Sequence, residues 1–273
     1  LDLDGKMIHF GEWLKIKTYR TFWILFLGFL IFFPLAFYFS ASKYMEAMSS
    51  RSAKVEEEIL KAMLDAPFVF PKVWHAASWM GGLFFILIGM LFILLITNEV
   101  QYRTHRQNII DGWSRMDFLK AKFSLVIFFV LVSTLLVFLC GFLVGITFST
   151  SKTGIFDGVY QVGYFALMAT LYLMLAYLVA ILVKRTGLSI IIYFAIVCIL
   201  DNVLWLIFTL KDSQIGYFMP LEAVDSLVPN PFKPRIMERR TVADYTLIIA
   251  AALYIAAYFY IIISYFRKTD LKT

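Results

Sequence analysis

The sequence predicts an all-α membrane protein with six transmembrane helices, and three observations lead to this prediction. The chain is 61% hydrophobic and only 16% charged over 273 residues, whereas soluble domains are closer to half apolar and a quarter charged. Six apolar stretches are each long enough to cross a hydrocarbon core, which takes about 20 helical residues. Lys and Arg are concentrated in alternate connections between these stretches, as expected for a protein that is threaded back and forth through a membrane.

The six predicted spans belong to a single transmembrane domain that covers residues 1–273. Each is dominated by aliphatic and aromatic side chains, and the first also contains Pro34, which membrane helices tolerate. The spans are placed at residues 21–40, 76–97, 123–149, 160–183, 189–210 and 244–266.

The distribution of basic residues predicts the orientation. The connections on the side of the two termini hold 14 of the 25 Lys and Arg residues in 57 of the positions outside the spans, and the other side holds the remaining 11 in 78 positions. The positive-inside rule therefore puts both termini in the cytoplasm and loop 41–75 outside, in a multi-pass protein of the cell inner (cytoplasmic) membrane. We attribute the net charge of +6 to this topology and expect no nucleic-acid partner.

The stretch before the first span mixes apolar and charged residues. This composition suits an amphipathic helix that lies in the lipid headgroup plane, with Glu12, Trp13, Lys15 and Arg20 as its interfacial residues. An ordinary basic juxtamembrane stretch explains the composition equally well.

The cytoplasmic connection 98–122 has the strongest local signals in the chain. Its first half can continue the preceding helix up to Gly112, a typical C-terminal stop, and Ser114 with Asp117 resembles a capping box for the next helix. We expect a stiff elbow that transmits force to a partner. The alternative is a solvated loop whose charges serve only the orientation of the chain.

Two features of the second half of the chain are open to more than one interpretation. Four prolines divide the connection 211–243, which predicts one or two short helices near the outer surface before the last span. Asp201 and Asn202 lie inside the fifth span, where a charged carboxylate is costly. In a functional interpretation they lie in a transport pathway or at a subunit interface. In a structural interpretation they cap a break in the helix, or the Asp201 carboxyl is hydrogen-bonded to a neighbouring helix. We favour the structural interpretation.

Familiar catalytic and nucleotide-binding patterns are missing from the sequence. It contains no G-x-x-x-x-G-K-[ST] phosphate loop and no G-x-S-x-G motif, and its three histidines lie far apart. We therefore expect no enzyme active site, no metal site and no cofactor in this chain.

Three segments resemble permease subunits of the ABC-2 class of ATP-binding-cassette transporters. They are the opening segment 12–20, the cytoplasmic connection, and the proline-bounded segment before the last span. In the connection, the resemblance rests on Glu99, Arg103, Thr104, Gln107, Ile110, Gly112, Ser114, Arg115 and Lys122.

The resemblance implies an exporter-type fold with an N-terminal interfacial helix and short external helices before the last span. It implies that two permease subunits, as a homodimer or heterodimer, form the substrate pathway, and that two separate ATPase subunits carry ATP and Mg. The residues that it implies for ATPase contact are Glu99, Tyr102, Arg103, Arg106, Gln107, Gly112, Ser114 and Arg115. Nothing in the sequence selects a substrate.

Two other functions fit a six-span protein. An ion-coupled secondary transporter normally needs several charges inside the membrane, and the sequence offers one clear case, Asp201. A non-transporting membrane subunit, such as an immunity protein, has no sequence feature that separates it from a permease.

Overall fold

The computed structural model describes residues 19–49, 67–101, 115–149, 153–211, 213–232 and 242–268. Within these ranges the protein is helical and has no strands. The long helices are α2 (Arg20–Ser49), α4 (Val73–Gln101), α6 (Arg115–Phe148), α7 (Tyr160–Val183) and α11 (Asp244–Lys268). A sixth helical rod is made of α8 (Thr186–Ala195), a π-helical turn (Ile196–Leu200) and α9 (Asp201–Thr209).

In the part of the chain that the structure describes, six helices are long and apolar enough to cross a membrane, which confirms the predicted all-helical, six-span class. The fourth span coincides with α7, Tyr160–Val183. Several of the other helices are longer than the predicted spans. A helix can continue past its apolar stretch, because polar residues in its last turns still make the backbone hydrogen bonds of the helix. The clearest case is α2, which continues to Ser49 and carries a Lys43–Glu46 ion pair of 2.7 Å on its last turns.

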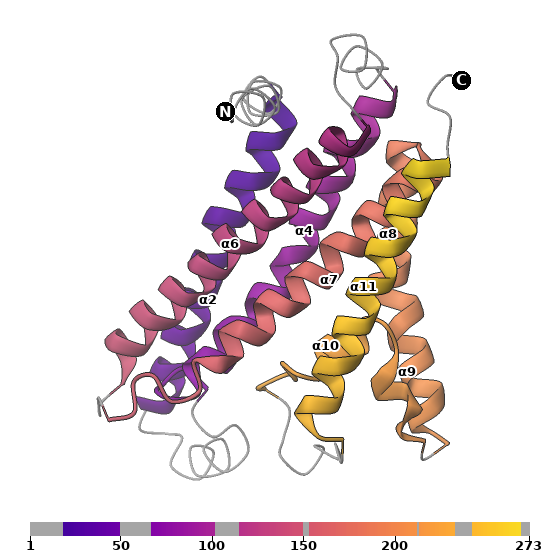
Figure 1. Ribbon diagram of the computed structural model, residues 1–273. Helices are drawn as coiled ribbons and strands as arrows, with labels where there is room; N and C mark the ends of the chain where they lie inside the picture. Colours follow the sequence, from indigo (N-terminus) through magenta and orange to yellow (C-terminus); the bar gives the residue numbers. More distant parts are fainter. Residues whose placement is uncertain are drawn as a thin grey trace, which may run out of the picture.

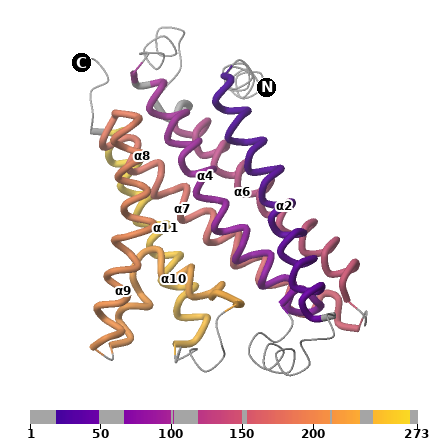
Figure 2. The backbone as a smooth tube through the Cα atoms, turned by 180° about the vertical axis from the view of Figure 1, so that it is seen from behind, coloured from indigo at the N-terminus to yellow at the C-terminus, as the bar shows by residue number. Residues whose placement is uncertain are grey.

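The helices form a bundle in which α4 and α7 are the central pair. In the apolar middle of α4, 56% of the residues are buried, and in that of α7 67% are buried. The corresponding share is 17% for both the α8–α9 rod and α11. Figures 1 and 2 show α2, α4 and α6 on one side of α7, with α8, α9 and α11 on the other. The start of α2 and the end of α11 lie at the same end of the bundle (Figure 1), as an even number of crossings requires.

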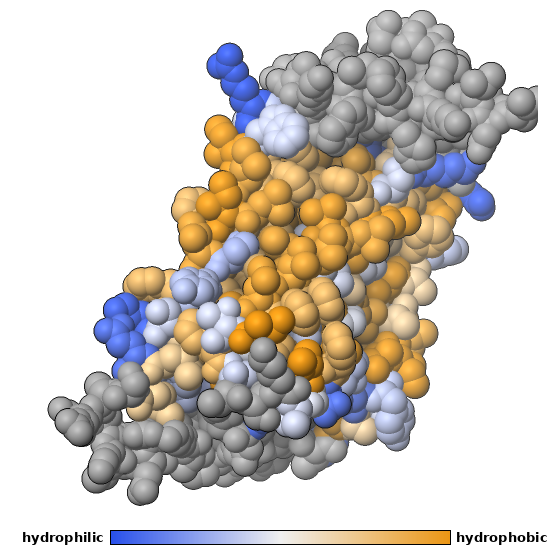
Figure 3. All heavy atoms as spheres, turned by 90° about the vertical axis from the view of Figure 1, so that its left-hand side faces the viewer, coloured by the Kyte–Doolittle hydropathy of each residue, from blue (hydrophilic) through white to orange (hydrophobic). Residues whose placement is uncertain are grey.

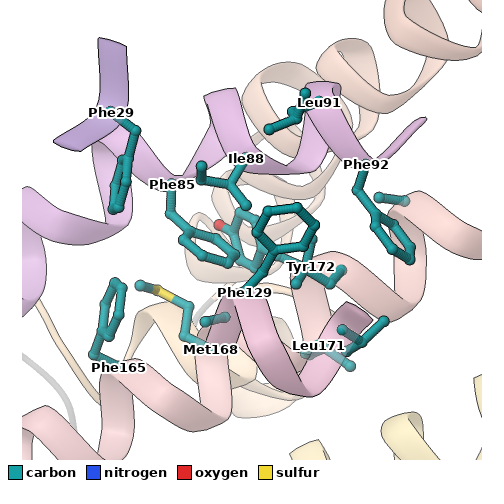
Figure 4. Close-up of a cluster of buried hydrophobic side chains, with 14 of the residues drawn as sticks. Phe29, Phe85, Ile88, Leu91, Phe92, Phe129, Phe165, Met168, Leu171 and Tyr172 are labelled. Atoms are coloured by element: carbon teal, nitrogen blue, oxygen red, sulfur yellow. The ribbon is translucent and has the colours of Figure 1, made fainter. Parts of the chain in front are cut away.

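Aromatic side chains fill the centre. The α2 stripe Phe22, Phe26, Phe29, Phe33 and Phe37 recurs at helical spacing and is buried. Figure 4 shows part of this core, where Phe85 of α4 packs edge-to-face against Phe29 and Phe165, with ring centroids 6.2 and 5.7 Å apart.

The outer surface carries many large apolar side chains. Examples are Ile24, Leu131, Leu253 and Tyr260, each more than 60% exposed. Figure 3 shows hydrophobic side chains across the middle of one face, with hydrophilic ones toward its two ends. A surface of this kind is matched to lipid, because lipid tails are as apolar as the side chains that face them.

Two short helices lie between α9 and α11. They are a 3-10 helix, η3 (Gln214–Phe218), and the single-turn α10 (Glu222–Asp225). Pro220 lies two residues after the first helix and Pro229 four residues after the second, so neither helix can be extended far along the chain. Figures 1 and 2 show α10 set inward from the ends of α9 and α11, so this connection folds back into the bundle.

Candidate functional site

The last residues of α4 bind three other parts of the protein. The Thr97 hydroxyl lies 2.8 Å from the Thr186 hydroxyl at the start of α8. Asn98 donates its side-chain amide to the Tyr19 hydroxyl just before α2, at 2.8 Å. Successive helical residues point about 100° apart, so neighbouring residues on one turn can reach different neighbours.

The third contact is an ion pair with α6. Lys122 Nζ lies 2.6 Å from Glu99 Oε1, and the side chains are 0% and 12% exposed. A buried pair of this kind contributes little net stability, but removing one partner leaves the other charge buried and costs much more. We call Tyr19, Thr97, Asn98, Glu99, Lys122 and Thr186 the α4 clamp. The α4 clamp joins the start or end of four spans at one end of the bundle.

The α4 clamp flanks the connection for which ATPase contact was predicted. Glu99 is part of the clamp, and Arg115 is the first residue of α6. Ser114, the predicted cap, is outside the described residues. The other predicted contact residues also lie outside them, namely Tyr102, Arg103, Arg106, Gln107 and Gly112. Of the interfacial residues, Arg20 begins α2 and is exposed, while Glu12, Trp13 and Lys15 lie outside the described residues.

A second polar region is centred on Asp201. Its side chain is 5% exposed, and Oδ1 accepts a hydrogen bond from the Leu221 backbone N–H at 3.3 Å. Leu221 immediately precedes α10, so the carboxylate satisfies a backbone donor at the start of this short helix. The helix that contains Asp201 does not break there. It takes a π turn, in which the Asp201 N–H bonds the Ile196 carbonyl five residues earlier.

Asn202 differs from Asp201 in its exposure. Its side chain points to the outside of the bundle and donates to the Val197 carbonyl of the π turn at 3.2 Å. A π turn changes the usual helical pairing of its carbonyl groups, and the Asn202 amide bonds one carbonyl of this turn. Asp201 and Asn202 are therefore adjacent in sequence but bind different elements. Asp201 binds the start of α10, and Asn202 binds the π turn of its own helix.

The contact between Asp201 and Leu221 shows how far the η3–α10 connection reaches into the helical bundle from the end of α9. Asp201 is eight residues from the end of α9, which is about 12 Å along a helix. Asp225 makes its contact with Tyr172, the thirteenth of the 24 residues of α7. Non-helical backbone at such depth is stable only where protein or water satisfies its polar groups, and Asp201 does so for Leu221.

Carboxylates gather where this connection meets α7. Both oxygens of Asp225 lie close to the Tyr172 hydroxyl, at 2.9 and 2.8 Å, and Glu222 accepts from Ser226 at 2.5 Å. Burial, and next the charge of Glu222, raise the pKa of the Asp225 carboxyl well above its usual value, against the lowering effect of the Tyr172 hydrogen bond. The charge of Asp201 raises it further. We call Asp201, Glu222, Asp225, Tyr172 and Tyr193 the acidic cluster.

Sequence reasoning found Asp201 but missed its surroundings. Glu222 and Asp225 stand in a proline-rich connection, where acidic residues are ordinarily solvated, so their sequence neighbours give no sign of their partial burial. Tyr172 sits in an apolar run and has the appearance of a core residue.

Among the residues that the structure describes, no group of three or more His, Cys, Asp or Glu side chains could hold a metal ion. No protein-family model and no curated protein matches the chain.

Proposed function

We propose that this chain is the membrane-spanning permease subunit of an ABC-2 type ATP-binding-cassette exporter. Two such subunits, identical or related, form the substrate pathway, and two separate ATPase subunits bind ATP and Mg and supply the energy. The chain itself is not an enzyme. The protein lies in the inner membrane of the cell. Its termini and the 102–114 connection face the cytoplasm.

The α4 clamp is the observation that carries this proposal. A force applied to the 102–114 connection acts first on the end of α4 and the start of α6, which the Glu99–Lys122 pair joins. Thr97 and Asn98 extend the same junction to α8 and to the start of α2. A movement of the connection would therefore reach four spans together, as a transporter driven from the cytoplasm requires.

Affinity purification through this chain tests the proposal directly. From the membranes of its own cell, the chain should bring down an ATPase subunit with a G-x-x-x-x-G-K-[ST] motif, and the complex should hydrolyse ATP. The chain freed of that subunit should bind no nucleotide, since it lacks the motif. Nucleotide retained by the isolated chain, or a complex without a nucleotide-binding subunit, would overturn the proposal.

Two substitutions test the coupling role of the connection. Gly112→Val should strain the proposed elbow, because a left-handed stop does not tolerate a β-branched side chain, and Arg115→Ala removes a predicted contact. Both should lower ATP hydrolysis by the complex while membrane insertion stays normal. Lys268→Ala, at the same end of the bundle on α11, serves as the control. Full ATPase activity in both test variants would show that the connection is not the coupler.

The proposed orientation has its own test. A membrane-impermeant maleimide applied to intact cells should label Ser50→Cys and leave Lys272→Cys unlabelled. The reverse pattern would put the connection outside the cell and remove the ATPase partner.

An ion-coupled secondary transporter is the second candidate, favoured by the acidic cluster. Asp201 does not stand alone, because the return of α10 brings the carboxyl of Asp225 close enough to interact with it electrostatically. The two candidates differ in their energy source. Transport by the chain alone in proteoliposomes, driven by an ion gradient without ATP, would favour the second candidate. A chain that is inactive alone and becomes active with its ATPase subunits and ATP would favour the first, and inactivity under both conditions would leave a non-transporting subunit.

A further inference from the structure

We propose that the acidic cluster is a proton-binding site inside the helical bundle, with Asp225 as its principal acceptor. This inference does not depend on an ATPase partner, because it concerns groups of this chain alone. Its components come from four elements: Tyr172 from α7, Tyr193 from α8, Asp201 from the start of α9, and Glu222 with Asp225 from α10.

The first argument is the proximity of like charges. The carboxyl of Asp225 interacts electrostatically with those of both Glu222 and Asp201. Asp201 is buried, and Glu222 and Asp225 are half-buried. Like-charged carboxylates that are withdrawn from water to this extent do not all remain ionised, so the group retains a proton that belongs to the set rather than to one member. The raised pKa of Asp225 agrees with this expectation.

The second argument is the contact between Asp225 and Tyr172. The Tyr172 hydroxyl oxygen is almost equally distant from the two carboxylate oxygens, at 2.9 and 2.8 Å. A phenol hydroxyl both donates and accepts. It can donate to the ionised carboxylate and accept from the protonated acid, so the contact persists in either protonation state. Tyr172 is only 6% exposed and lies in the aromatic core drawn in Figure 4.

The third argument is the hydroxyl of Tyr193. The residue is 0% exposed, and among the described residues its hydroxyl has no hydrogen-bond partner. It nevertheless interacts electrostatically with Asp225 and with Tyr172. Its place against α4 depends on Gly89, where a Cβ would overlap the hydroxyl. A buried, unpartnered donor beside a carboxyl group is costly unless it gains a partner in another state of the site.

A proton fits this site better than a metal ion. Calcium takes six to eight oxygen ligands and magnesium six in a regular arrangement. The carboxylates of the acidic cluster do not make such a set, since no group of three or more His, Cys, Asp or Glu among the described residues could hold a metal. A proton needs only one acceptor and a hydrogen-bond neighbour, and both are present.

Other titratable groups surround the site. Cys198 of the π turn interacts with Tyr193, and Tyr254 and Tyr258 of α11 interact with Asp201. Nearby, Tyr217 of η3 packs on Leu227 and Val228, Tyr164 of α7 donates to Asp244 of α11, and His75 of α4 contacts the Pro229 carbonyl at 2.6 Å. The pH response of Asp225 is therefore expected to include electrostatic effects from these groups.

Infrared spectroscopy of the purified chain in lipid nanodiscs tests the proposal, because a protonated carboxyl has a carbonyl stretch separate from that of a carboxylate. The wild-type chain should keep such a band at neutral pH and lose it as the pH is raised. In Asp225→Asn the band should be weaker and should disappear at a lower pH, because the two remaining carboxyl groups have lost one like-charged neighbour. Asp244→Asn, which removes the other aspartate that a tyrosine of α7 contacts, should retain it.

Tyr172→Phe keeps the argument testable if Asp225→Asn does not fold. Removing the Tyr172 donor takes away a hydrogen bond that favours the ionised carboxylate, so the band should persist to higher pH than in the wild type. A wild-type chain without the band at neutral pH, an unchanged band in Asp225→Asn, or an unchanged titration in Tyr172→Phe would each overturn the proposal.

Discussion

The α4 clamp and the acidic cluster are both buried polar regions in a lipid-matched bundle, but their charges are balanced differently. In the clamp, the ammonium of Lys122 faces the carboxylate of Glu99 at 2.6 Å, so opposite charges compensate each other. In the acidic cluster, Asp225 interacts with two further carboxyl groups and with hydroxyls. A compensated pair can remain charged and hold helices together over a wide pH range. A cluster of like groups must instead change its protonation when its surroundings change.

The largest expected effect comes from breaking the clamp. Lys122→Met removes the positive charge beside Glu99 and should lower the free energy of unfolding by about 3–5 kcal/mol, the usual cost of orphaning a buried charge. Thermal unfolding of the detergent-solubilised chain would measure it. The Lys122→Met/Glu99→Leu double variant removes both charges and should recover most of the loss. A double variant as unstable as the single one would argue against charge compensation.

The anchoring of the connection at Asp201 should have a smaller effect. Asp201→Ala leaves the buried Leu221 N–H without its acceptor, at a cost of about 1–3 kcal/mol. Asp201→Asn keeps an oxygen acceptor and should cost clearly less in the same unfolding assay. Equal losses in both variants would mean that the charge of Asp201, rather than its hydrogen bond, matters for stability.

The third prediction concerns pH. Because the pKa of Asp225 is raised in the folded protein, the folded state binds this proton more tightly than the unfolded chain does. The resulting stability is fully present below the ordinary carboxyl pKa of about 4, and it is lost as pH rises through the folded-state pKa. Melting temperature should therefore fall with rising pH in the wild type, and less steeply in Asp225→Asn. Parallel curves for the two proteins would contradict this linkage.

The smallest effect is expected at Asn202. Its amide satisfies one carbonyl of the π turn, from the exposed side of the helix, so Asn202→Ala should cost about 0.5–1.5 kcal/mol. A loss as large as that of Lys122→Met would indicate that Asn202 contacts more than its own helix. In that case, cross-linking of Asn202→Cys between copies would be the next measurement.

The two regions also differ in how far the sequence predicts them. Six apolar stretches were enough for the helical class, because hydrophobic length follows directly from bilayer thickness. Glu99 and Lys122 were both noticed as part of one segment, yet their pairing depends on the packing of α4 against α6. The acidic cluster could not be predicted, since it forms only when a connection returns to the middle of α7. The local sequence shows that Asp225 is polar, but it does not show that Asp225 contacts the middle of α7.

Hydrogen–deuterium exchange at two pH values, corrected for intrinsic exchange rates, tests the contrast between the regions most directly. Both regions are observed in one sample of the full chain. We predict that residues 213–232 exchange faster at high pH, when loss of the bound proton leaves repelling carboxylates, while the end of α4 and the start of α6 keep the same protection. Asp225→Asn should remove the difference in residues 213–232. Equal protection of both regions at both pH values would contradict the account.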